Sequence, residues 1–131
     1  MEPIGIIALA SKQAEWLTVR QSVVADNIAN VNTPNFKTKD VNSFNDVLNS
    51  QSSQTSHVSL VTTNARHMNI NDNSHDGIAV REQSGLAVSA AGNSVAIAHE
   101  MMKSGKIRQE YQLNTGLVKA LNNMLMSTIG K

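Results

Sequence analysis

The chain has no cysteine, and it holds only one Trp, one Tyr and two Phe among its 131 residues. Without cysteine, a disulfide framework and thiolate chemistry are excluded. So few aromatic side chains leave little to line a substrate pocket or to build a large independent core, and folding alone is marginal at this size. We therefore expect neighbouring subunits to supply part of the missing burial.

An excess of charge of one sign is also missing. Eleven basic and ten acidic residues give a net charge of +1, which is too small a surplus to neutralise many nucleic-acid phosphates. No apolar run approaches the ~18 residues that a membrane helix needs. Residues 1–14 are apolar but lack a basic n-region, so we expect no cleavable signal peptide. If the chain leaves the cytoplasm, it does so by a route that keeps its N-terminus.

Motifs for catalysis or ligand binding are absent from the sequence. There is no glycine-rich phosphate loop and no Gly-x-Ser-x-Gly nucleophile elbow. Zinc-binding pairs at helical i, i+4 spacing do not occur among the four histidines, which are His57, His67, His75 and His99. We therefore expect no enzymatic activity, no cofactor, no metal and no small-molecule substrate.

The first third of the chain has the periodicity of a helix packed on a partner. Apolar positions step by three and four, with Gln21 as the one polar interruption: Ile7, Ala10, Ala14, Leu17, Val24, Ile28 and Val31. A second apolar stripe lies beside this seam, at Leu9, Trp16, Val19 and Val23. Two stripes indicate two partners or burial in a bundle. We expect the helix to end at Asn32-Thr33-Pro34, because the residue before a proline avoids the helical region.

A second long helix is predicted from about Ser94 to Ile129. Its seam consists of Ile97, Met101, Tyr111, Val118, Leu121 and Leu125, and it is interrupted by Ser104, Arg108 and Asn114. A neighbouring stripe holds Leu113, Leu117, Ala120 and Met124. Gly105 inside the helix costs about 1 kcal/mol relative to alanine, which makes it a candidate for a kink. Asn93 and Ser94 are the candidate N-caps.

Between the helices, residues 42–77 are rich in Ser, Asn, Gln, Thr, His and Asp. The polar run 49–56 cannot bury enough surface to offset its chain entropy. Short strands are predicted at residues 57–62 and 78–81, and one or two helical turns at 43–48. The expected fold is mainly α, with long N- and C-terminal helices paired as a coiled coil and a small irregular or β-containing middle. Three segments follow, at residues 1–35, 36–92 and 93–131.

Four asparagines lie at or near the ends of these helices and allow two interpretations. Asn30 and Asn32 suit a C-cap followed by a turn, since Asn tolerates the left-handed conformation and bonds local backbone. Asn27 and Asn114 fit capping less well, because an Asn on an apolar seam costs stability unless it is paired. Such residues can instead fix the register between two helices. The sequence alone leaves both interpretations open.

At these positions the sequence resembles bacterial flagellar rod, hook and hook-associated proteins. The N-terminal likeness is Arg20-Gln21 followed by the run from Ala25 to Lys37, which contains the family's Asn-Ile-Ala-Asn and Asn-Thr-Pro patterns. Asn35 stands where the family usually has glycine, and Asn tolerates the positive φ expected there. The C-terminal run from Tyr111 to Asn114 is similar to the family's Tyr-x-x-Asn pattern. The short length and middle segment are most like a proximal rod protein.

The resemblance implies a structural subunit of the flagellar basal body, exported unfolded through the flagellar type III apparatus and stacked helically into the rod that transmits motor torque. Implied partners are copies of the chain, other rod proteins, membrane-ring and rod-adaptor proteins and the export apparatus. The assembly interface then comprises Ile7, Leu17, Val24, Asn27, Ile28, Asn30, Asn32, Thr33, Pro34, Tyr111, Asn114, Val118, Leu121 and Leu125.

The family's export motif, a Phe followed after three residues by a hydrophobe, is matched by Phe44 and Leu48. The pattern is short, and an isolated core anchor explains Phe44 as well. A function of another class also fits the apolar helices. A soluble helical adaptor or chaperone would bind a partner helix in its own groove, and it would fold and stay monodisperse alone.

Overall fold

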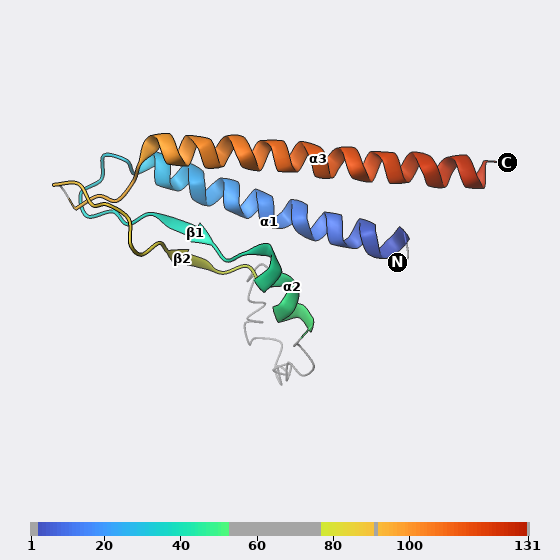
Figure 1. Ribbon diagram of the computed structural model, residues 1–131, viewed down its shortest axis with the longest axis horizontal. Helices are drawn as coiled ribbons and strands as arrows, with labels where there is room; N and C mark the ends of the chain where they lie inside the picture. Colours follow the sequence, from blue (N-terminus) through green and yellow to red (C-terminus); the bar gives the residue numbers. More distant parts are fainter. Residues whose placement is uncertain (1–2, 53–76, 91, 131) are drawn as a thin grey trace, which may run out of the picture. The chain divides into compact units, whose positions relative to one another are not determined.

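The computed structural model describes residues 3–52, 77–90 and 92–130. The described elements are α1 (Pro3–Ala29), β1 (Lys39–Val41), α2 (Phe44–Ser52), β2 (Val80–Glu82) and α3 (Ile97–Ile129), as Figure 1 shows. The predicted mainly α fold, with long terminal helices and a small middle that contains strands, is confirmed. The strand predicted at residues 57–62 lies outside the described residues, and the one predicted at 78–81 overlaps β2.

The chain forms two compact units, Met1–Val41 with Val80–Lys131, and Asn42–Ala79. In the first unit, α1 packs on α3, and β1 pairs with β2 in an antiparallel ladder. In the second unit, Ser43 accepts a hydrogen bond from the Asp46 N–H at 3.2 Å and so caps α2. Asn42 closes this unit, because its side-chain oxygen accepts from the N–H of Ala79 at 2.9 Å. The three segments predicted from the sequence stay a prediction.

Helices α1 and α3 run antiparallel and lie side by side (Figure 1). Asn27 near the end of α1 meets Glu100 near the start of α3, and Ala10 meets Asn114 further along. Leu17 therefore faces Ile107, with which it shares a groove. The apolar periodicity of the two seams makes Val118 and Leu121 candidate partners of Leu17 and Val24, and the observed offset of the helices shows this expectation to be wrong. Apolar periodicity defines a face but not its offset along the partner helix.

Few hydrophobic side chains are buried in the described part of the first unit. They are Ala10, Trp16, Leu17, Val24 and Ile107. Ile97 and Met101, placed in the seam by periodicity, are instead 43% and 59% exposed. At this end of α3 the inward position belongs to Glu100, which is 2% exposed. Because the prediction used only apolar residues, it placed the buried face of α3 about one residue away from the face that is buried here.

The end of α1 and the start of α3 both differ from the predicted residues. α1 ends at Ala29 rather than at Asn32, and Asn30 donates its side-chain amide to the Asp26 carbonyl at 2.9 Å. α3 begins at Ile97, after an extended Ala96 that makes no side-chain cap bond. Neither Asn93 nor Ser94 caps α3, because both side chains are engaged with the segment that follows α1. Gly105 causes no break, since α3 is continuous through it.

Candidate assembly interface

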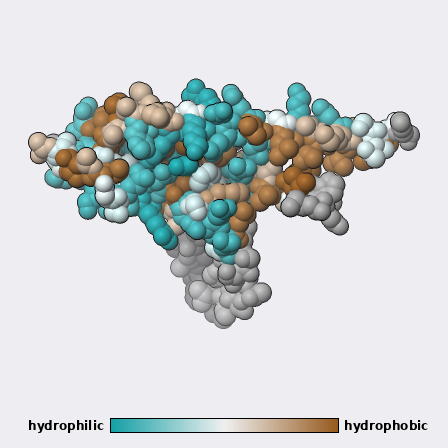
Figure 2. Space-filling view, viewed as in Figure 1, coloured by the Kyte–Doolittle hydropathy of each residue, from teal (hydrophilic) through white to brown (hydrophobic). Residues whose placement is uncertain are grey.

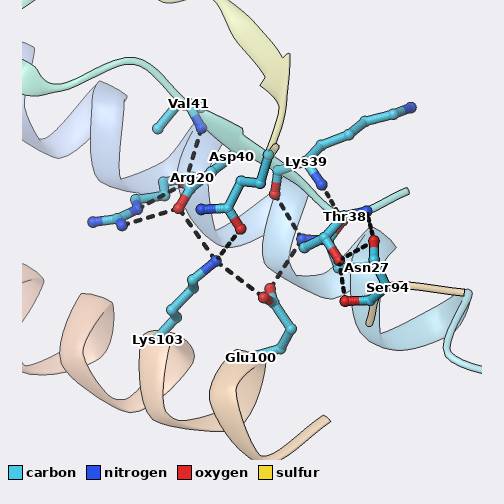
Figure 3. Close-up of polar contacts among 10 residues, drawn as sticks. Arg20, Asn27, Thr38, Lys39, Asp40, Val41, Ser94, Glu100 and Lys103 are labelled. Carbon is cyan, nitrogen blue, oxygen red and sulfur yellow. Dashed lines mark hydrogen bonds and ion pairs between the residues drawn. The ribbon is translucent and has the colours of Figure 1, made fainter. Parts of the chain in front are cut away.

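Asn27 joins three segments at the inner end of the helix pair. Its side-chain NH₂ donates to the Lys39 carbonyl at 2.7 Å and to Glu100 Oε2 on α3 at 2.9 Å. Its Oδ1 accepts the Lys39 N–H at 3.0 Å. The amide thus pairs with both backbone groups of one β1 residue and with the opposite helix, and Asn27 is fully buried (Figure 3).

Asp40, which follows Lys39 in β1, is the second residue that joins these segments. Its carboxylate receives a two-point contact from the Arg20 guanidinium, Nε to Oδ1 at 3.0 Å and Nη2 to Oδ2 at 3.2 Å. The Lys103 ammonium lies 3.3 Å from Oδ2 and also donates to Glu100 at 3.0 Å. We call Arg20, Asn27, Asp40, Glu100 and Lys103 the polar cluster; it connects α1, β1 and α3 (Figure 3).

The environment of Asp40 lowers the pKa of its carboxyl. Burial raises this pKa, but the hydrogen bonds from Arg20 and from the Val41 N–H, with the positive charges of Arg20 and Lys103, outweigh burial. The pKa of Asp40 therefore lies below its usual value of about 3.9. Since both partners are cations, the cluster holds Asp40 ionised at neutral pH.

A second set of bonds fastens the segment before α3 to the segment after α1. Asn93 donates to the carbonyls of Asn30, Val31 and Thr33, at 3.1, 2.6 and 2.9 Å. Ser94 Oγ accepts the Thr38 N–H at 2.9 Å. The Asn93 amide thus pairs carbonyls of the turn that follows α1, and the Ser94 hydroxyl pairs the Thr38 N–H.

The turn beside these bonds requires an unusual backbone. Asn35 has φ +58°, which confirms the prediction that Asn replaces glycine at a left-handed position. Gly92 also has a positive φ of +74°, and a side chain there would meet Asn35. The turn at Asn35 and the turn at Gly92 therefore pack closely against each other.

Two polar residues on the apolar seams bond across the helix pair. Gln21 donates to Ser104 Oγ at 3.0 Å, and Asn114 donates to the Ala10 carbonyl at 2.7 Å. The Oδ1 atom of Asn114 is buried without a partner among the described residues. Directional bonds at several levels along the pair are of the kind that fixes register.

The structure distributes the predicted interface residues over three environments. Leu17, Val24, Asn27 and Asn114 are buried between the helices. Half-buried residues are Ile7, Ile28, Val118, Leu121 and Leu125 on the same helices and Asn30 directly after α1. Exposed positions are Asn32, Thr33, Pro34 and Tyr111. The predicted export residues Phe44 and Leu48 are half-buried on α2.

Sequence reasoning did not identify the polar cluster as a unit. Glu100 and Lys103 stand one helical turn apart, and such charged residues are normally taken as solvent-facing. One feature of the sequence could have indicated the polar cluster: Arg20 precedes Gln21, the polar residue of an otherwise apolar seam. Its partner Asp40 is on a three-residue strand that no apolar pattern indicated.

The two ends of the helix pair differ in charge. Of the charged residues on α1 and α3, only Lys119 lies outside residues 12–26 and 100–110. The other end, where α1 begins and α3 finishes, carries exposed apolar side chains such as Leu113, Leu117 and Met124 (Figure 2). Among the described residues no helix is long and apolar enough to cross a membrane. The same residues contain no group of three or more His, Cys, Asp or Glu suited to a metal.

Comparison with known proteins identifies relatives along almost the whole chain. Residues 17–37 match the family model described as flagella basal body rod protein. The flagellar basal body rod protein FlgB of Agrobacterium fabrum (strain C58 / ATCC 33970) is 45% identical over 132 residues, which cover 98% of this chain and 96% of that protein. FlgB of Bacillus subtilis (strain 168) is 29% identical, over 83% of this chain and 78% of its own length. The matched segment 17–37 contains the α1 half of the polar cluster.

The two seam asparagines should differ in what they contribute to stability. Asn27→Leu leaves both Lys39 backbone groups and one Glu100 oxygen unpaired, so we expect it to destabilise the chain by about 3 kcal/mol or more. Asn114→Leu removes an acceptor that is already unpaired, so we expect stability within about 1 kcal/mol of the wild type, or above it. Urea unfolding followed by helical circular dichroism measures both. Equal losses in the two variants would contradict the assignment of Asn27 as the junction.

Asp40 should make stability depend on acid pH. Because the pKa of Asp40 is lowered by folding, its contribution is complete above the unfolded pKa of about 3.9 and is lost as pH falls through the folded pKa. We expect the stability difference between the wild type and Asp40→Asn to be largest above about pH 4 and to shrink towards pH 2. Urea midpoints at a series of pH values test this. A difference that stays constant over that range would show that Asp40 does not carry the dependence.

Proposed function

Because the chain belongs to the FlgB family of flagellar basal body rod proteins, we propose that it is a subunit of the proximal rod, stacked helically so that the rod transmits motor torque. Membership of the family makes the chain a structural component of the rod in the basal body of the bacterial flagellum. The proximal position, the helical stacking and the mechanical role are the parts that we propose.

The observation that carries the proposal is the imbalance between buried and exposed apolar side chains. Among its described residues the first unit buries five hydrophobic side chains, whereas α3 alone exposes nine large ones: Ile97, Met101, Met102, Tyr111, Leu113, Leu117, Met124, Met126 and Ile129. Exposed apolar surface of this extent indicates protein–protein contact.

The helix pair supports such a role because its internal contacts resist sliding. The polar cluster, the Gln21–Ser104 bond and the Asn114–Ala10 bond tie α1 to α3 at separate levels. Apolar contacts alone would allow a shift by one turn at modest cost, whereas a shift here would leave buried charges unpaired. Each subunit thus presents a defined surface to its neighbours. Stacking through two different surfaces gives an open helical array.

We propose as partners the copies of this chain, the other rod subunits, and the membrane-ring and rod-adaptor proteins at the rod base. The chain would reach them through the flagellar export apparatus. In this proposal Phe44 and Leu48 are read by the apparatus while the chain is unfolded. Both are half-buried on α2 and next to the fully buried Val47, so folding would compete with their recognition.

Incorporation into the rod is tested with Leu17→Asp in a strain that lacks the chromosomal copy. Leu17 is fully buried, and an unpaired carboxylate there costs several kcal/mol. We expect wild-type protein in purified basal bodies, with rod density beside the membrane ring in electron micrographs. Leu17→Asp should restore neither rods nor motility. Wild-type protein absent from basal bodies would contradict the proposed function, and normal motility of Leu17→Asp would contradict the helix pairing.

Export is tested with Phe44→Ala, and Phe36→Ala is the matched control. Phe36 is the chain's other phenylalanine and is also half-buried, but it lies outside the proposed motif. In a strain that cannot complete its rod, we expect Phe44→Ala to lower exported protein while cytoplasmic protein stays near normal, and Phe36→Ala to be exported. As a core change alone, Phe44→Ala would cost about 3–5 kcal/mol and lower the cellular level. Undiminished export of Phe44→Ala would contradict the proposal that Phe44 belongs to an export motif.

A further inference from the structure

Three consecutive residues of α3, Asn114, Thr115 and Gly116, each carry a feature that disfavours a regular, closely packed helix. Asn114 is 6% exposed, and its side-chain NH₂ donates to the Ala10 carbonyl at 2.7 Å. Its Oδ1 is buried and has no partner among the described residues. A buried acceptor without a donor forfeits the hydrogen bond that it makes in water. A conformation in which α3 opens away from α1 at this level would therefore return a hydrogen bond to Oδ1.

Thr115 and Gly116 weaken the backbone of the same turn. Thr115 Oγ1 donates to the Tyr111 carbonyl at 2.9 Å, which is the carbonyl that the Thr115 N–H uses in a regular helix. Hydroxyl bonds of this kind destabilise a helix slightly and often bend it. Gly116 follows, and glycine favours a helix interior less than any residue except proline. A Cβ at Gly116 would meet nothing within 4 Å, so no contact in the described part of the chain requires a glycine there.

This turn lies where the hydrogen bonds between the two helices end. On one side of it, the polar cluster and the Gln21–Ser104 bond hold α3 to α1. The Asn114–Ala10 bond is the last of these contacts. Beyond it, residues 115–129 make side-chain hydrogen bonds only within α3. The end of α3 also extends past the start of α1 (Figure 1), so the final turns of α3 have less support.

We infer that α3 bends at Asn114–Gly116, so that residues 117–129 take more than one direction while the rest of the helix pair stays fixed. Sharp helix kinks, of more than about 20°, are found at proline, at glycine beside serine, and where a side chain enters the backbone hydrogen bonds. Ser127 lies about 16 Å along the helix from Gly116, so a bend of about 25° would displace it by about 7 Å. The bend goes beyond the proposed function and does not depend on it.

Gly105 provides a comparison within the same helix. It is also interior to α3, and a Cβ there would likewise meet nothing within 4 Å. Its neighbour Ser104, however, bonds across the helix pair to Gln21 at 3.0 Å. Ile107, close by on the same helix, is only 3% exposed. Gly105 therefore lies where contacts with α1 oppose a bend, and Gly105→Ala is the matched control for Gly116→Ala.

Distances between paired spin labels measure the bend in the purified chain. Because the chain has no cysteine, labels attach only to introduced ones. The pair Ser11→Cys and Ser127→Cys joins exposed positions on α1 and near the end of α3, so its distance changes when α3 bends. The pair Gln109→Cys and Ser127→Cys lies along α3 and crosses the same turn. A bend hardly changes this second distance, whereas unravelling of the helix end would change it.

We expect a broad or two-peaked distance distribution for the pair 11–127 and a narrow one for the pair 109–127. Gly116→Ala and Thr115→Val, which remove the glycine and the hydroxyl bond, should each narrow the 11–127 distribution towards a single distance. Gly105→Ala should leave it broad. All three variants should keep the helical content of the chain without these substitutions.

Several results would overturn the bend. One is a narrow 11–127 distribution in the chain that carries only the labels. Another is a distribution that stays equally broad in Gly116→Ala and Thr115→Val. Equal narrowing by Gly105→Ala would assign the effect to helix propensity in general. A 109–127 distribution as broad as that of 11–127 would show that the end of α3 unravels instead of bending.

Discussion

Asn27 and Asp40 connect α1, β1 and α3 through contacts that involve neighbouring residues of one short strand. Asn27 binds the backbone of Lys39, while Asp40 pairs with Arg20 and Lys103. Without them, β1 would be a three-residue strand paired only with β2, and such short pairings are marginal alone. The polar cluster makes up for the small apolar core, because a misplaced buried charge costs more than a misplaced methyl group.

Much of the fold could be predicted from the sequence because it depends on local pattern. The periodicity around Leu17 and Val24 indicated the long first helix, and the polar composition after residue 42 indicated a small middle segment. The pairing of the helices could not be predicted at residue level. Their register depends on contacts such as Asn27 with Glu100, which are 73 residues apart in the chain. The same holds for Asn93, which looked like a cap for α3 and bonds instead to carbonyls that follow α1.

The candidate interface could likewise not be predicted where it depends on contacts between distant parts of the sequence. The asparagines were recognised as unusual, but whether they cap helices or join them depends on which partner lies opposite. Asn30 bonds within its own helix end, whereas Asn27 and Asn114 bond to the other helix. The role of Arg20 in the polar cluster depends on its pairing with Asp40. Nothing in the composition around Asp40 indicates that its side chain is buried. A charged residue is read as exposed unless its partner is known.

The long sequence separation of these contacts has a kinetic consequence. Ala10 meets Asn114 across 104 residues, and Thr38 meets Ser94 across 56. Closing such loops carries an entropic cost before any contact forms, so folding is slow compared with that of proteins built from local contacts. During synthesis the first helix has no partner until the last third of the chain exists. The helix pair therefore cannot form before the end of the chain has been made, a delay that would favour the unfolded export that we propose.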